Sequence, residues 1–147
     1  RLLADRLDSE CYLHVKEGES GDHVRPNTVY SAPGGKHMTI SRSGGEMTLT
    51  CAPGPKVHSC CPSVDVLFDS VAKQIGDDAM GVILTGMGRD GADGLLEMRK
   101  AGSPTIGQDE KTSTVYGMPR AAWEEGAVQE QFPLEKIADA ITKIVRN

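Results

Sequence analysis

Hydrophobic and polar side chains alternate in the first third of the chain, which is the pattern of half-buried β-strands. Two short runs, at 12–16 and 28–32, alternate in this way and are separated by turn-forming residues. Two further runs, at 37–41 and 46–50, flank the turn sequence Arg-Ser-Gly-Gly and predict an antiparallel β-hairpin. The opening sequence RLLADRL indicates the end of a helix.

From Pro62 onward the hydrophobic period becomes that of helices separated by buried strands. After Ser63, which is placed to cap a helix, apolar residues recur at 64, 67, 68 and 71. A continuous apolar run at 79–85 is typical of a strand buried on both faces of a parallel sheet. Further helices are predicted at 95–102, 118–126 and 134–145, strands at 104–108 and 127–131, and a short extended piece at 113–117. This alternation predicts an α/β fold, with a doubly wound, mostly parallel sheet, helices on both faces and an antiparallel β-hairpin region in the first third.

Length and charge narrow the class of protein. A chain of 147 residues has the size of one domain. It carries 16 basic and 21 acidic side chains, a net charge of −5, without a basic stripe, so binding to nucleic acid is not expected. No apolar run approaches the ~20 residues that cross a bilayer, and the charged first residues do not form a secretory signal. We therefore expect a cytoplasmic protein with no direct membrane insertion.

The cysteines predict neither a disulfide scaffold nor a metal site. Cys60 and Cys61 are adjacent, and together with His58 they offer three candidate metal ligands. No second ligand pair accompanies them, whereas structural zinc sites use four well-spaced ligands. We therefore expect no metal, no cofactor and reduced thiols, including those of Cys11 and Cys51.

A glycine-rich loop follows the buried strand and has two interpretations. Residues 86–91, Gly-Met-Gly-Arg-Asp-Gly, match the G-x-G-x-x-G pattern of dinucleotide sites, and Asp109 and Glu110 stand where a ribose-binding acid is expected. However, Asp90 would bring its negative charge close to the pyrophosphate. The alternative places the chemistry on Asp90, because α/β folds carry their sites at the carboxyl ends of strands. There it could orient a histidine in a nucleophilic triad, or simply cap the helix that begins near Ala92.

Four segments resemble one family. The sequences at 62–73, 81–102 and 113–122 resemble the C-terminal catalytic domain of the CheB chemotaxis methylesterases, and 15–40 resembles that family's middle region. The resemblance extends over essentially the whole chain and is most specific at TGMGRDGA and YGMP.

The resemblance implies an esterase that removes methyl groups from glutamyl methyl esters of methyl-accepting chemoreceptors and that can deamidate receptor glutamines. It implies a Ser-His-Asp mechanism without metal or cofactor, in which Asp90 matches the histidine-orienting aspartate. The backbone N–H of Met87 matches a contributor to the oxyanion hole. It also implies a place in two-component signalling, with a phosphorelay receiver domain and a chemotaxis kinase as further candidate partners.

The serine and the histidine of the family do not carry over to residues 1–147. The chain begins at Arg1, and we expect both groups in a preceding segment, so that this single, partial catalytic domain is inactive alone and includes no receiver domain. None of the four histidines lies in a matching motif; His37 and His58 are expected at the surface. A nucleotide-binding module that uses the 86–91 loop and a catalytically silent interaction domain remain as alternatives.

Overall fold

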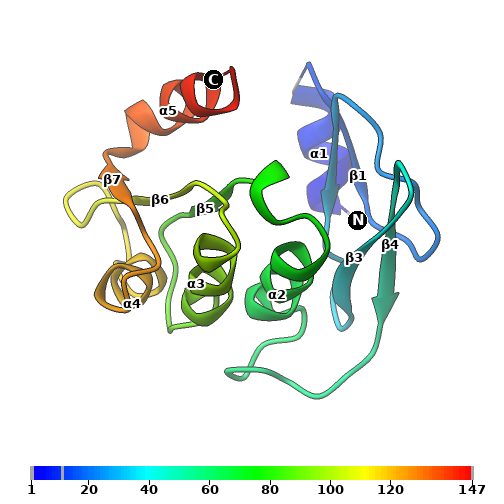
Figure 1. Cartoon of the computed structure of the whole chain (residues 1–147), viewed down its shortest axis with the longest axis horizontal. Helices are drawn as coiled ribbons and strands as arrows, with labels where there is room; N and C mark the ends of the chain where they lie inside the picture. Colours follow the sequence, from blue (N-terminus) through cyan, green and yellow to red (C-terminus); the bar gives the residue numbers. More distant parts are fainter. Residues whose placement is uncertain (1, 11, 147) are drawn as a thin grey trace.

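The computed structural model describes residues 2–10 and 12–146, and its N-terminal part is a helix packed on two parallel strands (Figure 1). Helix α1 (Leu2–Glu10) packs against strand β1 (His14–Glu17). Strand β1 pairs in parallel with β2 (Thr28–Ser31). The helix and the two strands that the sequence predicts here are therefore confirmed.

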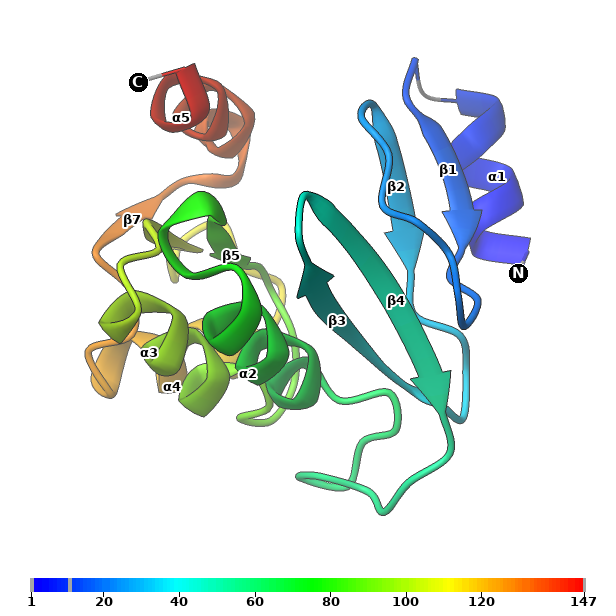
Figure 2. The ribbon, with the colours of Figure 1, turned by 45° about the vertical axis from the view of Figure 1, so that its right-hand side comes forward.

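The predicted hairpin is formed by β3 (His37–Ser43) and β4 (Glu46–Ala52), which pair antiparallel. Met38 and Leu49 are buried, whereas the turn residues between the strands are exposed. Figure 2 shows the hairpin between the β1–β2 pair and the helices of the C-terminal part. It therefore joins the two parts of the molecule.

Helix α2 (Val64–Gln74) covers the free edge of β3. The backbone N–H of Ile40 donates to the Ser70 hydroxyl over 3.0 Å. The N–H of Arg42 donates to the Gln74 side-chain oxygen over 3.1 Å. Helix side chains thus satisfy strand donors that would otherwise have no partner.

A three-stranded parallel sheet forms the C-terminal part, with β6 in the middle and β5 and β7 at its sides. Its strands are β5 (Gly81–Ile83), β6 (Thr105–Gln108) and β7 (Glu130–Phe132). The remaining elements are the short 3₁₀ helix η1 (Gly76–Asp78) and helices α3 (Ala92–Lys100), α4 (Met118–Glu124) and α5 (Leu134–Arg146).

This sheet has a hydrophobic core on each face, because successive residues of a strand point to opposite sides. On one face, Ile83 packs with Leu95 and Met98 of α3 and with residues of α2 and α4. On the other face, Ile106 packs with Ile137 and its neighbours on α5. The two cores confirm the predicted α/β class with helices on both faces.

In the described residues the parallel strands lie in two sheets, β1–β2 and β5–β6–β7. Strand β5 pairs with β6 on one side and is therefore an edge strand in this part of the chain. No helix among the described residues is both long and apolar enough to span a bilayer.

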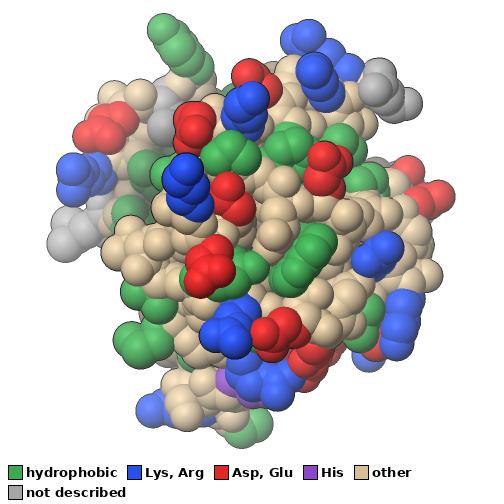
Figure 3. All heavy atoms as spheres, turned by 90° about the vertical axis from the view of Figure 1, so that its left-hand side faces the viewer, with side chains coloured by type: hydrophobic (Ala, Val, Ile, Leu, Met, Phe, Trp, Pro, Cys, Tyr) green, Lys and Arg blue, Asp and Glu red, His purple; other side chains and the backbone are tan. Residues whose placement is uncertain are grey.

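Charges of both signs are mixed on the surface. On the face shown in Figure 3, acidic and basic side chains alternate with scattered hydrophobic ones, and no continuous basic stripe crosses it. This distribution agrees with the overall charge of −5 and differs from that of a phosphate-backbone binder.

Helices α2 and α3 approach closely at Gly94, and a side chain at this position would disrupt their contact. A Cβ on Gly94 would lie 2.7 Å from the Phe68 Cβ and 3.0 Å from an Asp65 oxygen. We expect Gly94→Ala to lower the free energy of unfolding by about 1–3 kcal/mol, the usual cost of overpacking. Urea denaturation measures the loss, and Gly34→Ala is the control because a Cβ there meets open space. Equal stability of the two variants would contradict the tight contact.

Candidate active site

Asp90 lies in the loop after β5, at the carboxyl end of the strand, and the residue is 4% exposed. Its Oδ1 accepts a hydrogen bond from the Ser63 hydroxyl at 2.8 Å and one from the Asp65 N–H at 3.2 Å. Its Oδ2 accepts from the Val64 N–H at 2.7 Å. The carboxylate is thus held at the N-terminus of α2, where backbone donors and the helix dipole favour a negative group.

The first turns of α2 and α3 exchange their capping groups. Asp65, in the first turn of α2, accepts hydrogen bonds on Oδ1 from the N–H groups of Gly91 (3.1 Å) and Gly94 (2.7 Å) at the start of α3. Asp90 precedes α3 and caps α2. The expectation that Asp90 caps its own helix is therefore wrong: the N-cap of α3 is Gly91, at φ 100°, without a side-chain bond. A positive φ favours glycine at position 91. This backbone conformation directs the Asp90 side chain away from α3, the helix that follows it.

The YGMP segment holds the loop next to Asp90 in place. Gly86 forms a parallel bridge with Tyr116, and its carbonyl accepts hydrogen bonds from Gly117 (3.1 Å) and Met118 (2.8 Å). A Cβ on Gly117 would lie 2.8 Å from the Gly86 oxygen, so only glycine allows this approach. The distinctive motif is thus the support of the 86–91 loop.

Met87 projects from this loop into solvent, with 83% of its surface exposed. Within residues 2–10 and 12–146, its backbone N–H has no hydrogen-bond acceptor. An N–H group that is held by its neighbours and lacks a partner can donate to an incoming oxygen. The role of Met87 as an oxyanion-hole donor stays a prediction, and the exposed position of the residue is compatible with it.

Ser63 contacts Asp90 and His37 contacts Ser63, yet their hydrogen bonds do not form a nucleophilic triad. His37 Nε2 donates to the Pro55 carbonyl over 2.7 Å, and Nδ1 accepts the Ser63 N–H over 3.2 Å. The Ser63 hydroxyl donates to Asp90 and accepts the Val66 N–H over 3.4 Å. No imidazole nitrogen is left to take the serine proton. Ser63 is the predicted helix cap, whereas the expectation of a surface His37 is wrong, since it is 9% exposed.

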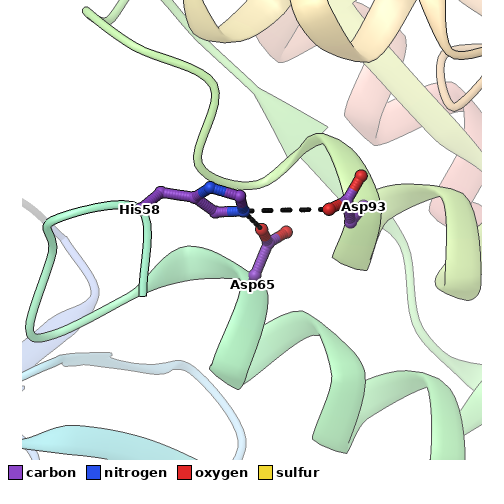
Figure 4. Close-up of side chains that lie close together, drawn as sticks. All are labelled: His58, Asp65 and Asp93. Carbon is purple, nitrogen blue, oxygen red and sulfur yellow. Dashed lines mark ion pairs between the residues drawn. The ribbon is translucent and has the colours of Figure 1, made fainter. Parts of the chain in front are cut away.

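A second group of side chains gathers on the outer side of the exchanged caps (Figure 4). His58 Nε2 lies 3.0 Å from Asp65 Oδ2 and 3.7 Å from Asp93 Oδ2. The cysteines of the same loop take no part: the Cys60 thiol points to the His58 carbonyl, and Cys51, Cys60 and Cys61 are free, while Cys11 lies outside the described residues. Neither aspartate was predicted from the sequence, although Asp65 and Asp93 each stand in the first turn of a helix, where capping acids concentrate.

Burial raises the pKa of Asp65, and the negative charges of Asp90 and Asp93 raise it further, against the opposing effects of the Gly94 N–H and of His58. A carboxyl with a raised pKa binds its proton more tightly in the folded than in the unfolded state. The free energy of unfolding therefore falls as pH rises from the ordinary value of 3.8 through the raised one.

We expect Asp65→Asn to flatten this pH dependence, because asparagine keeps an oxygen for the α3 N–H groups but does not ionise. Urea denaturation in steps from about pH 4 to neutral measures the slope. The same pH dependence of the free energy of unfolding in both proteins would show that ionisation of Asp65 does not destabilise the folded state.

Comparison with a solved structure defines the class of protein. The chain superposes on the crystal structure of the Thermotoga maritima CheB methylesterase catalytic domain with a TM-score of 0.94 and 36% sequence identity, covering 98% of this chain and 76% of that one. The fold is therefore that of a hydrolase catalytic domain. Residues 1–141 match the family described as CheB methylesterase, and the chain belongs to this family.

Curated relatives agree with the assignment to the CheB methylesterase family. The "protein-glutamate methylesterase/protein-glutamine glutaminase 2" of Syntrophomonas wolfei subsp. wolfei is 51% identical over 145 residues, which are 99% of this chain and 42% of that protein. A protein of the same name from Hahella chejuensis is 53% identical over 139 residues, 95% of this chain and 38% of its own length. The chain thus spans less than half the length of these relatives. Membership in a hydrolase family favours the catalytic interpretation of the 86–91 loop over the dinucleotide one.

Proposed function

We propose that this chain is part of the catalytic domain of a protein-glutamate methylesterase, which hydrolyses glutamyl methyl esters on methyl-accepting chemoreceptors and deamidates receptor glutamines. The observation that carries the proposal is the buried Asp90 carboxylate, anchored after β5 in the same loop as the Met87 N–H, which has no acceptor among the described residues, in a chain of this family.

In this proposal Asp90 orients the imidazole of a catalytic histidine. An ionised carboxylate offers about four lone-pair positions, and Ser63, Val64 and Asp65 use three of them, two on Oδ1 and one on Oδ2. The remaining position on Oδ2 can accept an imidazole N–H. Because three fixed donors hold the carboxylate, it would present that position in one orientation, which fixes the tautomer and supports the imidazolium formed during reaction.

The reaction then follows from the groups around this carboxylate. A serine hydroxyl attacks the ester carbonyl, the histidine takes the serine proton, and the Met87 N–H donates to the oxygen that becomes negative. The histidine returns the proton to the departing methoxide, which leaves as methanol. Water hydrolyses the acyl-enzyme in the same manner and yields the receptor glutamate.

We propose that the serine and the histidine come from a segment outside residues 1–147 that packs beside β5. Leu84, Met87 and Val115 border the Asp90 loop, and they are 42%, 83% and 44% exposed, respectively. Strand β5 is an edge strand in the described part of the chain. An exposed apolar rim next to an open strand edge favours a further segment at this place.

The test is the release of methanol from methylated chemoreceptors in membranes. The intact protein that contains this chain should release methanol, and the 147-residue chain alone should release about 10⁶-fold less, the loss that follows removal of a triad nucleophile. Comparable rates from the isolated chain would place the nucleophile within residues 1–147. An intact protein that binds receptors without releasing methanol would be an interaction domain instead.

A further inference from the structure

We propose that His58, Asp65 and Asp93 form a binding site for one divalent transition-metal ion, of which Zn²⁺ is the best match. The site lies where the 53–62 loop meets the first turns of α2 and α3 (Figure 4). It stands apart from the ester-hydrolysing chemistry proposed above and does not depend on it.

The spacing of the three ligand atoms fits a single metal ion. Zinc bonds of about 2.0–2.2 Å to nitrogen and oxygen, at tetrahedral or octahedral angles, hold neighbouring ligand atoms about 2.8–3.6 Å apart. His58 Nε2 lies 3.0 Å from Asp65 Oδ2 and 3.7 Å from Asp93 Oδ2, and all three atoms lie within 4.8 Å of one another. One ion in the space between them can reach all three after small side-chain adjustments.

One carboxylate oxygen of the cluster is buried and lacks a hydrogen-bond donor among the described residues. Asp65 is 4% exposed, and its Oδ2 has no hydrogen bond within the described residues. His58 is at ion-pair distance but does not donate a hydrogen bond to it. A buried carboxylate oxygen without a donor is costly, whereas a metal ion satisfies it. Figure 4 shows this oxygen directed to the imidazole, into the cluster.

The other oxygens of the two aspartates are already held. Asp65 Oδ1 accepts the N–H groups of Gly91 and Gly94, and Asp93 Oδ1 lies 3.3 Å from an Arg89 nitrogen. The two Oδ2 atoms lie toward His58 Nε2, at 3.0 and 3.7 Å. Partners that fix the second oxygen of a ligating carboxylate are the usual support of a metal site.

The charge around the cluster is negative beyond what its cations balance. Besides its own Asp65 and Asp93, the carboxylates of Asp69, Asp90, Glu97 and Glu125 lie around it. Arg89, which pairs with Asp93 and Glu125, and Lys73, which acts on Asp69, are the facing cations. Burial, and next the neighbouring carboxylates, raise the pKa of Asp69. A divalent cation offsets this excess, and the carboxylates lie between the ion and the partial positive charges of the two helix N-termini.

The donor set selects the class of ion. Imidazole suits zinc, copper, iron and nickel, whereas a site for magnesium or calcium is built from oxygen alone. One nitrogen and two carboxylate oxygens leave a fourth position for water, as in three-ligand zinc sites. A bound ion would tie the 53–62 loop to the two helix ends that hold Asp90, and would therefore stabilise that arrangement.

The experiment titrates Zn²⁺ into the untagged 147-residue chain by calorimetry, with Co²⁺ absorption as a report on coordination. All proteins carry Cys60→Ser and Cys61→Ser, so that neighbouring thiols cannot bind the metal. We expect one ion per chain, and binding at least about tenfold weaker in His58→Gln and in Asp93→Asn. His23→Gln is the matched control, because His23 is also a surface histidine near a carboxylate, Glu46, at 3.5 Å. Binding should weaken as pH falls, since protons compete for the ligands.

Zn²⁺ should also raise the unfolding temperature of the parent and of His23→Gln, but not that of His58→Gln. Far-UV circular dichroism verifies that each variant is folded. If Asp93→Asn does not fold, the comparison between the parent and His58→Gln tests the site. Two results would overturn the proposal: no Zn²⁺ binding, or equal affinity in the parent and His58→Gln. Tighter binding of Mg²⁺ or Ca²⁺ than of Zn²⁺ would contradict the transition-metal assignment.

Discussion

Replacing Asp90 by asparagine should lower the turnover of methylated receptor by roughly 10⁴ in the intact protein. The amide keeps the size of the carboxylate but supplies no charge to support the imidazolium, and its NH₂ group can force the wrong histidine tautomer. The same NH₂ would also face N–H donors of α2, since Asp90 accepts from Val64 and Asp65. We therefore expect an additional loss of about 1–3 kcal/mol in the free energy of unfolding.

Two controls separate catalysis from stability in this experiment. Ser63→Ala removes one hydrogen bond to Asp90 but leaves the carboxylate, so it should cost about 1 kcal/mol of stability and less than tenfold in turnover. Asp139→Asn changes the same functional group on the exposed face of α5 and should have no effect on turnover. A loss below tenfold in Asp90→Asn would reduce Asp90 to a cap of α2.

Replacing Met87 by proline should lower turnover by about 10²–10³, the usual effect of removing one oxyanion-hole donor. Proline has no N–H, while the exposed Met87 side chain makes little contact that could be lost. KM should change much less than kcat, because the developing oxyanion, and not the bound ester, uses the donor.

Met87→Ala is the matched variant for this prediction, since it removes the side chain and keeps the N–H. It should lose less than tenfold in turnover, and thermal unfolding should verify that the proline variant is folded. Similar losses in both variants would assign the role to the methionine side chain, for example in receptor contact, and would remove the N–H from the mechanism.

The fold could be predicted element by element because the hydrophobic periods are clear. The hairpin at His37–Ala52 and helix α5 follow directly from alternation and from a 3.6-residue stripe. The pairing of the parallel strands could not be derived in this way. Parallel register depends on contacts across the whole domain, and a buried apolar run such as that of β5 carries no directional information.

The site was predicted only as far as single residues and motifs define it. The positions of Asp90 and Met87 follow from the glycine loop and from the resemblance to the CheB family. The exchange of caps between Asp65 and Asp90 could not be predicted. Each carboxylate accepts backbone N–H groups at the start of a helix that is distant from it in sequence. The burial of His37 could not be predicted for a related reason. A polar residue at the start of a strand is expected to be exposed, and its backbone partners, which are distant in sequence, are known only from the structure.

A crystal structure of the intact protein tests the central claim most directly. We predict an imidazole nitrogen of a histidine from outside this chain within about 2.6–3.2 Å of Asp90 Oδ2, with a serine hydroxyl on the opposite side of that ring. A carboxylate that contacts only Ser63, Val64 and Asp65, with no histidine beside it, would contradict the proposed role of Asp90 and leave it as a structural group.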